Sequence, residues 1–76
     1  MKKKITDGAF LKSIGERIVM IRKQKGLTQA GFAALCGKKP QSIERVENGK
    51  VNASIEFFYQ LARALGVPLG EFFVNW

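Results

Sequence analysis

Residues Gln29–Gly49, QAGFAALCGKKPQSIERVENG, are the stretch around which the rest of the chain is organised. They predict two short helices, the first capped by Thr28 and the two separated by a tight turn at Gly37. Pro40 suits the first position of the second helix, since its missing N–H would be unpaired there. Because polar side chains remain on the outer face of that helix, this stretch is the place to expect a ligand contact.

The residues before this stretch predict a longer helix over residues 10–25, which Gly26 ends in a left-handed conformation. Its apolar residues recur at steps of three and four and form one stripe: Leu11, Ile14, Ile18 and Ile21.

The residues after it predict a fourth helix, which Ser54 caps and Gly66 ends. A short fifth element runs from Gly70 to about Val74. Five helices and no convincing strand predict an all-α fold, a compact five-helix bundle.

The chain has 76 residues, and we expect one domain over residues 8–76 after a flexible basic tail at residues 1–7. The single Cys36 excludes an internal disulfide and favours a reducing, cytoplasmic location. No apolar run approaches the roughly 20 residues that span a bilayer, so no membrane partner is expected.

Charge is distributed unevenly along the sequence. The net charge is +7, and only Arg63 of the 13 Lys and Arg residues lies beyond Lys50. A small basic domain suggests an anionic partner, most often nucleic acid. The alternative is a solvated basic surface with no partner.

Catalysis is hard to place on this sequence. It contains no His, no pair of Cys residues and no close pair of carboxylates with an acid–base role. Metal-ligand spacings and a glycine-rich phosphate loop are also absent. We therefore expect no enzyme activity, no metal, no cofactor and no small-molecule substrate.

DNA binding is easier to place. A helix fits the major groove of B-DNA, and Gln41 and Arg45 lie one turn apart on the same face of the second helix of the stretch. Gln can pair with adenine and Arg with guanine. Lys38 and Lys39 stand at the positive end of that helix, which makes sense if DNA phosphates bind there. The alternative is two solvated loop lysines.

Several motifs in register resemble the Cro and repressor helix-turn-helix proteins, the XRE family. The motifs are GLTQ at 26–29, ENGK at 47–50 and LARALGV at 61–67, with Ala33, Gly37, Ile43 and Val46 between them. The resemblance covers about residues 14–73. It implies a phage-repressor type of fold with the helix-turn-helix at helices 2 and 3, and a bacterial or phage regulator that binds double-stranded operator DNA as a homodimer.

The resemblance also implies roles for single residues. Gln41 and Arg45 match base-reading positions, and Arg22 and Glu47 match a partly buried ion pair that orients Arg22 near the phosphate backbone. Gln29 matches a phosphate-binding position, and Ser42, Asn48 and Lys50 match or adjoin such positions. With the two lysines named above, the predicted phosphate-binding set comprises Arg22, Gln29, Lys38, Lys39, Ser42, Asn48 and Lys50. Pro40 departs from the family, because a base-reading polar side chain often stands there.

The C-terminal residues Phe72, Phe73, Val74 and Trp76 are very apolar, and an exposed patch of this kind usually marks an interface. We predict that they form the dimer interface. One alternative is that they fold back onto the first helix. Another is that they cover a partner protein, which would make the chain an antitoxin or an interaction module.

Overall fold

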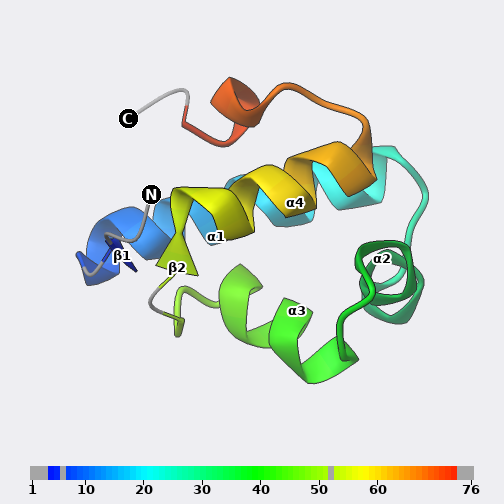
Figure 1. Ribbon diagram of the computed structural model, residues 1–76, viewed down its shortest axis with the longest axis horizontal. Coiled ribbons are helices and arrows are strands. Elements are labelled where there is room, and N and C mark those ends of the chain that lie inside the picture. The colour runs from blue at the N-terminus through cyan, green and yellow to red at the C-terminus, as the bar shows by residue number, and fades with distance from the viewer. Residues whose placement is uncertain (1–3, 6, 52, 74–76) are drawn as a thin grey trace.

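The computed structural model describes residues 4–5, 7–51 and 53–73. In these residues four α-helices and one 3₁₀ helix surround a single core (Figure 1). The elements are β1 (Lys4–Ile5), α1 (Gly8–Gln24), α2 (Gln29–Cys36), α3 (Pro40–Glu47), β2 (Ala53–Ser54), α4 (Ile55–Leu65) and η1 (Leu69–Phe73).

Local sequence signals set the helix ends. Asp7, Thr28 and Ser54 cap α1, α2 and α4, each accepting a hydrogen bond from a backbone N–H three residues on. Gly37 follows α2 with φ at 67°, a left-handed conformation that costs glycine little. The caps predicted at Thr28 and Ser54 and the turn at Gly37 are confirmed.

The fold class needs two corrections. The prediction of five α-helices is wrong, because the fifth element is a 3₁₀ helix that begins at Leu69 and ends at Phe73. The expectation of no strand is also wrong, since Lys4 pairs antiparallel with Ser54 and Ile5 with Ala53. Strand β1 lies inside the predicted tail at residues 1–7, whereas β2 directly precedes α4. Two residues a strand are too few for a period-2 pattern to be visible in the sequence.

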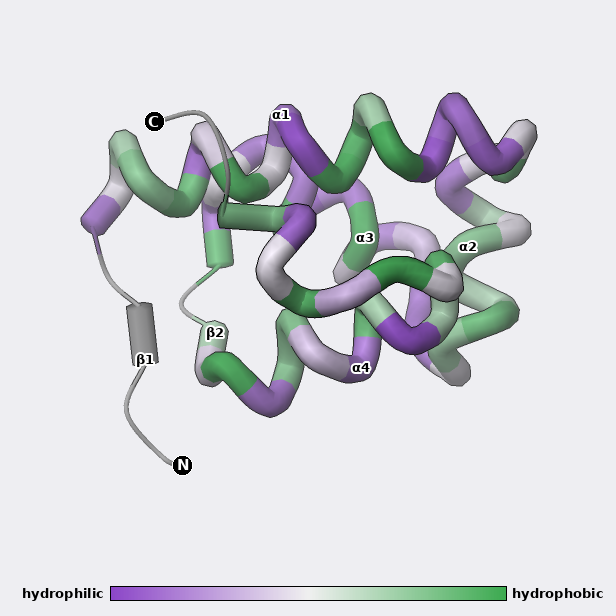
Figure 2. The backbone as a smooth tube through the Cα atoms, turned by 90° about the horizontal axis from the view of Figure 1, so that it is seen from above, coloured by the Kyte–Doolittle hydropathy of each residue, from purple (hydrophilic) through white to green (hydrophobic). Residues whose placement is uncertain are grey.

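The core lies between α1 and α4, with α2 and α3 closing it on one side and η1 on the other (Figure 1). Hydrophilic and hydrophobic stretches alternate along α1, as an amphipathic helix requires (Figure 2). The fully buried side chains that fill the core are Ile14, Ile18, Phe32, Ile43, Phe58, Leu61 and Phe72.

The predicted dimer interface changes accordingly. Phe72 is 0% exposed within one chain, so its assignment to the interface is wrong. Phe73 is half-buried and stacks on Phe10 of α1, with ring centroids 6.1 Å apart. Phe72 therefore folds back into the core, as the alternative predicted, whereas Phe73 packs on α1 and stays partly exposed. Val74 and Trp76 lie outside the described residues.

An ion pair adds a polar tie between η1 and α1. Arg17 Nε donates to the backbone carbonyl of Glu71 at 2.8 Å, and Arg17 Nη2 lies 3.3 Å from Glu71 Oε1.

None of the helices in the described part of the chain combines the length and the apolar character needed to span a membrane.

Candidate nucleic-acid interface

Helix α3 has an apolar inner face and a polar outer face. Ile43 and Val46 are buried, whereas Gln41 and Arg45 are exposed. Pro40 is the first residue of α3, and Lys39 before it is extended with φ −80° and ψ 148°, as a residue before proline prefers. The outer face therefore presents the two predicted base-reading side chains from one short helix.

Arg45 is partly held in place. Its Nη2 donates to the backbone carbonyl of Lys50 at 3.0 Å, and Lys50 N donates to the carbonyl of Arg45 at 2.9 Å. A guanidinium has five N–H donors, so most of them remain for another acceptor. Gln41 makes no side-chain hydrogen bond with any part of the chain that the structure describes.

The carboxyl end of α3 is fixed by a buried polar network, which we call the Glu47 network: Arg22, Gln29 and Glu47. Arg22 Nε and Nη2 donate to the two carboxylate oxygens of Glu47 at 2.6 and 3.2 Å. Gln29 Nε2 donates to Glu47 Oε1 at 2.8 Å, and Arg22 Nη1 donates to the carbonyl of Leu27 at 2.8 Å. The predicted ion pair between Arg22 and Glu47 is confirmed. The hydrogen bond from Gln29 to Glu47 is not predicted by the sequence.

This network involves two of the residues predicted to bind phosphate. The side chain of Arg22 is only 9% exposed, and each of its three guanidinium nitrogens donates one hydrogen bond within the chain, so Arg22 has a structural role. Two of its five N–H donors have no partner among these bonds, and its phosphate contact stays a prediction. The amide of Gln29 is half-buried and donates to Glu47. Its backbone N–H, in the first turn of α2, is the group through which Gln29 could still meet a phosphate.

Two further residues of the predicted phosphate-binding set make hydrogen bonds within the chain. Asn48 Nδ2 donates to both the carbonyl and the Oε2 of Glu44 at 2.8 Å, so both of its hydrogens are in use. Lys38 Nζ donates to Gln60 Oε1 of α4 at 3.0 Å. The Lys38–Gln60 contact joins residues 22 positions apart, so periodicity in the sequence could not reveal it. The Asn48–Glu44 contact is a local pair four residues apart.

The remaining predicted contacts lie near α3. Lys39 and Lys50 are exposed at its two ends, and Ser42 is half-buried in its first turn. Together with Arg45, the two lysines place cations along the exposed side of α3. Among the described residues of this outer face, only Glu44 carries a carboxylate. Within the described residues, no group of three His, Cys, Asp or Glu side chains could hold a metal ion.

Two glycines allow α3 and its following turn to approach α1, and sequence reasoning missed both contacts. A Cβ on Gly15 would lie 2.6 Å from the carbonyl oxygen of Val46 and would also clash with that of Glu47. Gly49 has φ at +70°, and a Cβ there would lie 2.7 Å from Lys12 Cα. A glycine inside the apolar stripe of a helix is a signal of such close packing.

Two short helices joined by a tight glycine turn, the second with a polar outer face and a buried inner face, define a helix-turn-helix of the kind that docks on DNA. Residues 18–72 match the family described as "Helix-turn-helix", and the chain belongs to this family.

Relatives and solved structures agree with this assignment. The chain is 38% identical over 56 residues to the uncharacterized HTH-type transcriptional regulator y4dJ of Sinorhizobium fredii, covering 74% of this chain and 73% of that protein. It is 37% identical over 59 residues to the HTH-type transcriptional regulator PuuR of Escherichia coli, covering 78% of this chain but only 32% of PuuR.

Among solved structures, the fold matches the restriction-modification controller protein C.AhdI from Aeromonas hydrophila with a TM-score of 0.80 and 34% identity. The match covers 84% of this chain and 97% of C.AhdI. The protein is thus a DNA-binding transcriptional regulator of the helix-turn-helix type.

Proposed function

We propose that the chain binds operator DNA in the cytoplasm as a homodimer, with α3 in the major groove and with Gln41 and Arg45 reading base edges. The observation that carries the proposal is the exposed pair Gln41 and Arg45 on a helix whose opposite face is buried. Side chains near the start of such a helix reach base edges first.

Phosphate contacts complete the proposed interface. Lys39 and Lys50 are exposed at opposite ends of α3, and Ser42 lies between them. Contacts at both ends would fix the position of the helix on the duplex, because phosphate contacts set register and orientation while base contacts set specificity.

Homodimerisation is the second part of the proposal. Two copies related by twofold symmetry would place two α3 helices in successive major grooves, with half-sites about 10 bp apart. Phe73 is half-buried and, with Val74 and Trp76, remains the proposed interface. A monomeric mass at micromolar concentration in light scattering would contradict the homodimer.

Binding to a partner protein through the C-terminal aromatics receives less support. Phe72 is fully buried and Phe73 stacks on Phe10 of the same chain, so the apolar surface left for such a partner is smaller than the sequence implies. DNA binding therefore remains the proposal.

The base-reading role is tested with Arg45→Ala and fluorescence anisotropy on a selected operator. We expect a loss of about 1–3 kcal/mol in binding free energy and a relaxed preference at one base pair. Arg63→Ala on α4 removes the same charge away from α3 and serves as the control. Equal losses for the two variants, with the base preference intact, would contradict the role of Arg45.

A further inference from the structure

The turn between α2 and α3 is fixed to α2 by its backbone. Gly37 N donates to the carbonyl of Ala34 at 3.2 Å, and Lys38 N donates to that of Ala33 at 2.9 Å. These bonds set where the turn begins, but they leave open what holds it against the rest of the domain. Lys39, which precedes α3, makes no side-chain capping bond.

The side chain of Lys38 connects this turn to α4. Its ammonium nitrogen lies 3.0 Å from Gln60 Oε1 and 4.9 Å from the ring centroid of Phe57. A cation within about 6 Å of an aromatic centroid is attracted to the face of the ring. Lys38 is half-buried, whereas the neighbouring Lys39 is exposed. Two consecutive lysines in the sequence therefore occupy different environments.

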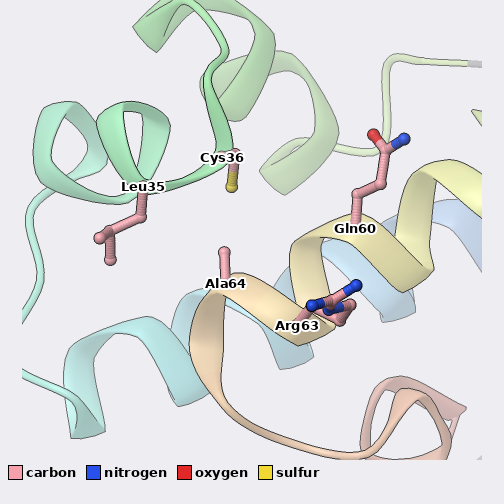
Figure 3. A pocket seen from close by; sticks show the side chains of 5 residues that line it. All are labelled: Leu35, Cys36, Gln60, Arg63 and Ala64. Atoms are coloured by element: carbon pink, nitrogen blue, oxygen red, sulfur yellow. The ribbon is translucent and has the colours of Figure 1, made fainter.

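Packing alone does not close the space between α2 and α4. An open hollow of about 310 Å³ is lined by Leu35 and Cys36 of α2 and by Gln60, Arg63 and Ala64 of α4 (Figure 3). Figure 3 shows Cys36 and Ala64 directed toward each other across it. Gln60 both lines the hollow and accepts the hydrogen bond from Lys38. The polar contact thus joins the α2–α3 turn to α4 next to a place where apolar contact is incomplete.

We propose that Lys38 is a positioning residue for DNA binding: it fastens the α2–α3 turn to Gln60 and Phe57 of α4 and so sets the angle at which α3 meets the major groove. This assignment replaces the predicted phosphate contact of Lys38, and it rests on the proposed function. The other end of α3 is held by the Glu47 network, so loss of the Lys38 contact frees one end only. Specific contacts need side chains held to within about 0.5 Å, so they are sensitive to such a loss.

The test compares Lys38→Met with the matched variant Lys39→Met. Both remove one charge from the same turn, and methionine keeps an unbranched apolar side chain. Anisotropy is measured across a series of salt concentrations with the selected operator and with a scrambled duplex.

A lysine that contacts phosphate contributes about 0.9 to the slope of log K against log salt. We expect Lys39→Met to reduce the slope by about that amount and to weaken both duplexes alike. For Lys38→Met we expect the slope to change by less than about a quarter of that amount. It should weaken the operator by about 3–10-fold at every salt concentration while leaving the scrambled duplex near the wild-type value.

Gln60→Leu is a second variant. It changes no charge, and it removes the acceptor of the hydrogen bond from Lys38. We expect it to reproduce the loss of operator affinity, and we expect the double variant with Lys38→Met to lose no more than either single variant. Circular dichroism confirms that each variant is folded at the assay temperature. If Lys38→Met does not fold, Gln60→Leu alone decides.

Two results would overturn the assignment: a slope for Lys38→Met that falls as far as that for Lys39→Met, or wild-type operator affinity for Gln60→Leu. Either result would leave the proposed function standing, provided that the wild-type chain prefers the operator. A wild-type chain that binds both duplexes equally would instead overturn the proposed function and this inference together.

Discussion

The two ends of α3 are held in different ways. At the carboxyl end, Glu47 is 6% exposed and receives hydrogen bonds from Arg22 and Gln29. At the amino end, the half-buried Lys38 meets Gln60 on the surface of α4. Removing one partner of a buried ion pair strongly destabilises the fold, whereas removing a contact near the surface changes stability little. The carboxyl end of α3 should therefore govern folding, and the amino end should govern how α3 meets DNA.

The Glu47 network also joins parts of the chain that are distant in sequence. Arg22 comes from α1, Gln29 from α2 and Glu47 from α3. Among the described residues, every buried side-chain nitrogen and oxygen has a hydrogen-bond partner. A fully satisfied network of this kind orients three helices at once, while a partly satisfied one is costly.

The largest effect is expected for Glu47→Ala, which leaves the buried Arg22 guanidinium without its carboxylate. We expect the free energy of unfolding to fall by about 3–5 kcal/mol, measured by urea denaturation with circular dichroism. Glu44→Ala removes an exposed carboxylate from the same helix and should change stability by less than about 0.5 kcal/mol. Similar losses of stability for the two variants would mean that the buried carboxylate of Glu47 stabilises the fold no more than the exposed carboxylate of Glu44.

A smaller effect is expected for Gly15→Ala, which places a methyl group against the carbonyls of Val46 and Glu47 at the carboxyl end of α3. Crowding of this kind costs about 1–3 kcal/mol, although the higher helix propensity of Ala offsets about 1 kcal/mol of it.

The control for this substitution is Gly8→Ala in the same helix, where a Cβ would meet nothing within 4 Å. Thermal unfolding should show a lower midpoint for Gly15→Ala and an equal or higher one for Gly8→Ala. If Gly15→Ala unfolds no earlier than Gly8→Ala, α1 and α3 do not approach as closely as described.

The smallest effect is expected at the amino end, on the reactivity of Cys36. Burial raises the pKa of the Cys36 thiol, and the positive charge of Lys38 partly lowers it. Lys38→Met removes the lowering charge, so the pKa should rise further and less thiolate should be present at pH 8. Alkylation by iodoacetamide at pH 8 should then be slower, because the thiolate is the nucleophile.

Lys39→Met serves as the control for this measurement, because Lys39 is not a cause of the Cys36 shift. Its alkylation rate should match that of the wild-type chain. An alkylation rate in Lys38→Met that equals or exceeds that of the wild-type chain would contradict the proposed effect of the Lys38 charge on Cys36.

The sequence predicts those features that depend on neighbouring residues. Thr28 and Ser54 are recognisable caps, Gly37 is a recognisable turn residue, and the stripe of Ile14 and Ile18 marks the buried face of α1. Each of these signals is set within a few positions of the chain.

The features that the sequence did not predict depend on distant partners. Lys38 and Gln60 are 22 positions apart, and Arg17 and Glu71 are 54 apart. Periodicity indicates which face of a helix is apolar, but not which helix will pack beside it. For the same reason the burial of Phe72 could not be distinguished from exposure in an interface.

Selection of bound sequences from a random DNA pool would show whether α3 reads DNA as part of a symmetric homodimer. A symmetric homodimer should enrich an inverted repeat with half-site centres about 10 bp apart. In Arg45→Ala one base pair of each half-site should lose its preference. Recovery of sequences with no enriched half-site, or of the same repeat from Arg45→Ala, would contradict this mode of binding.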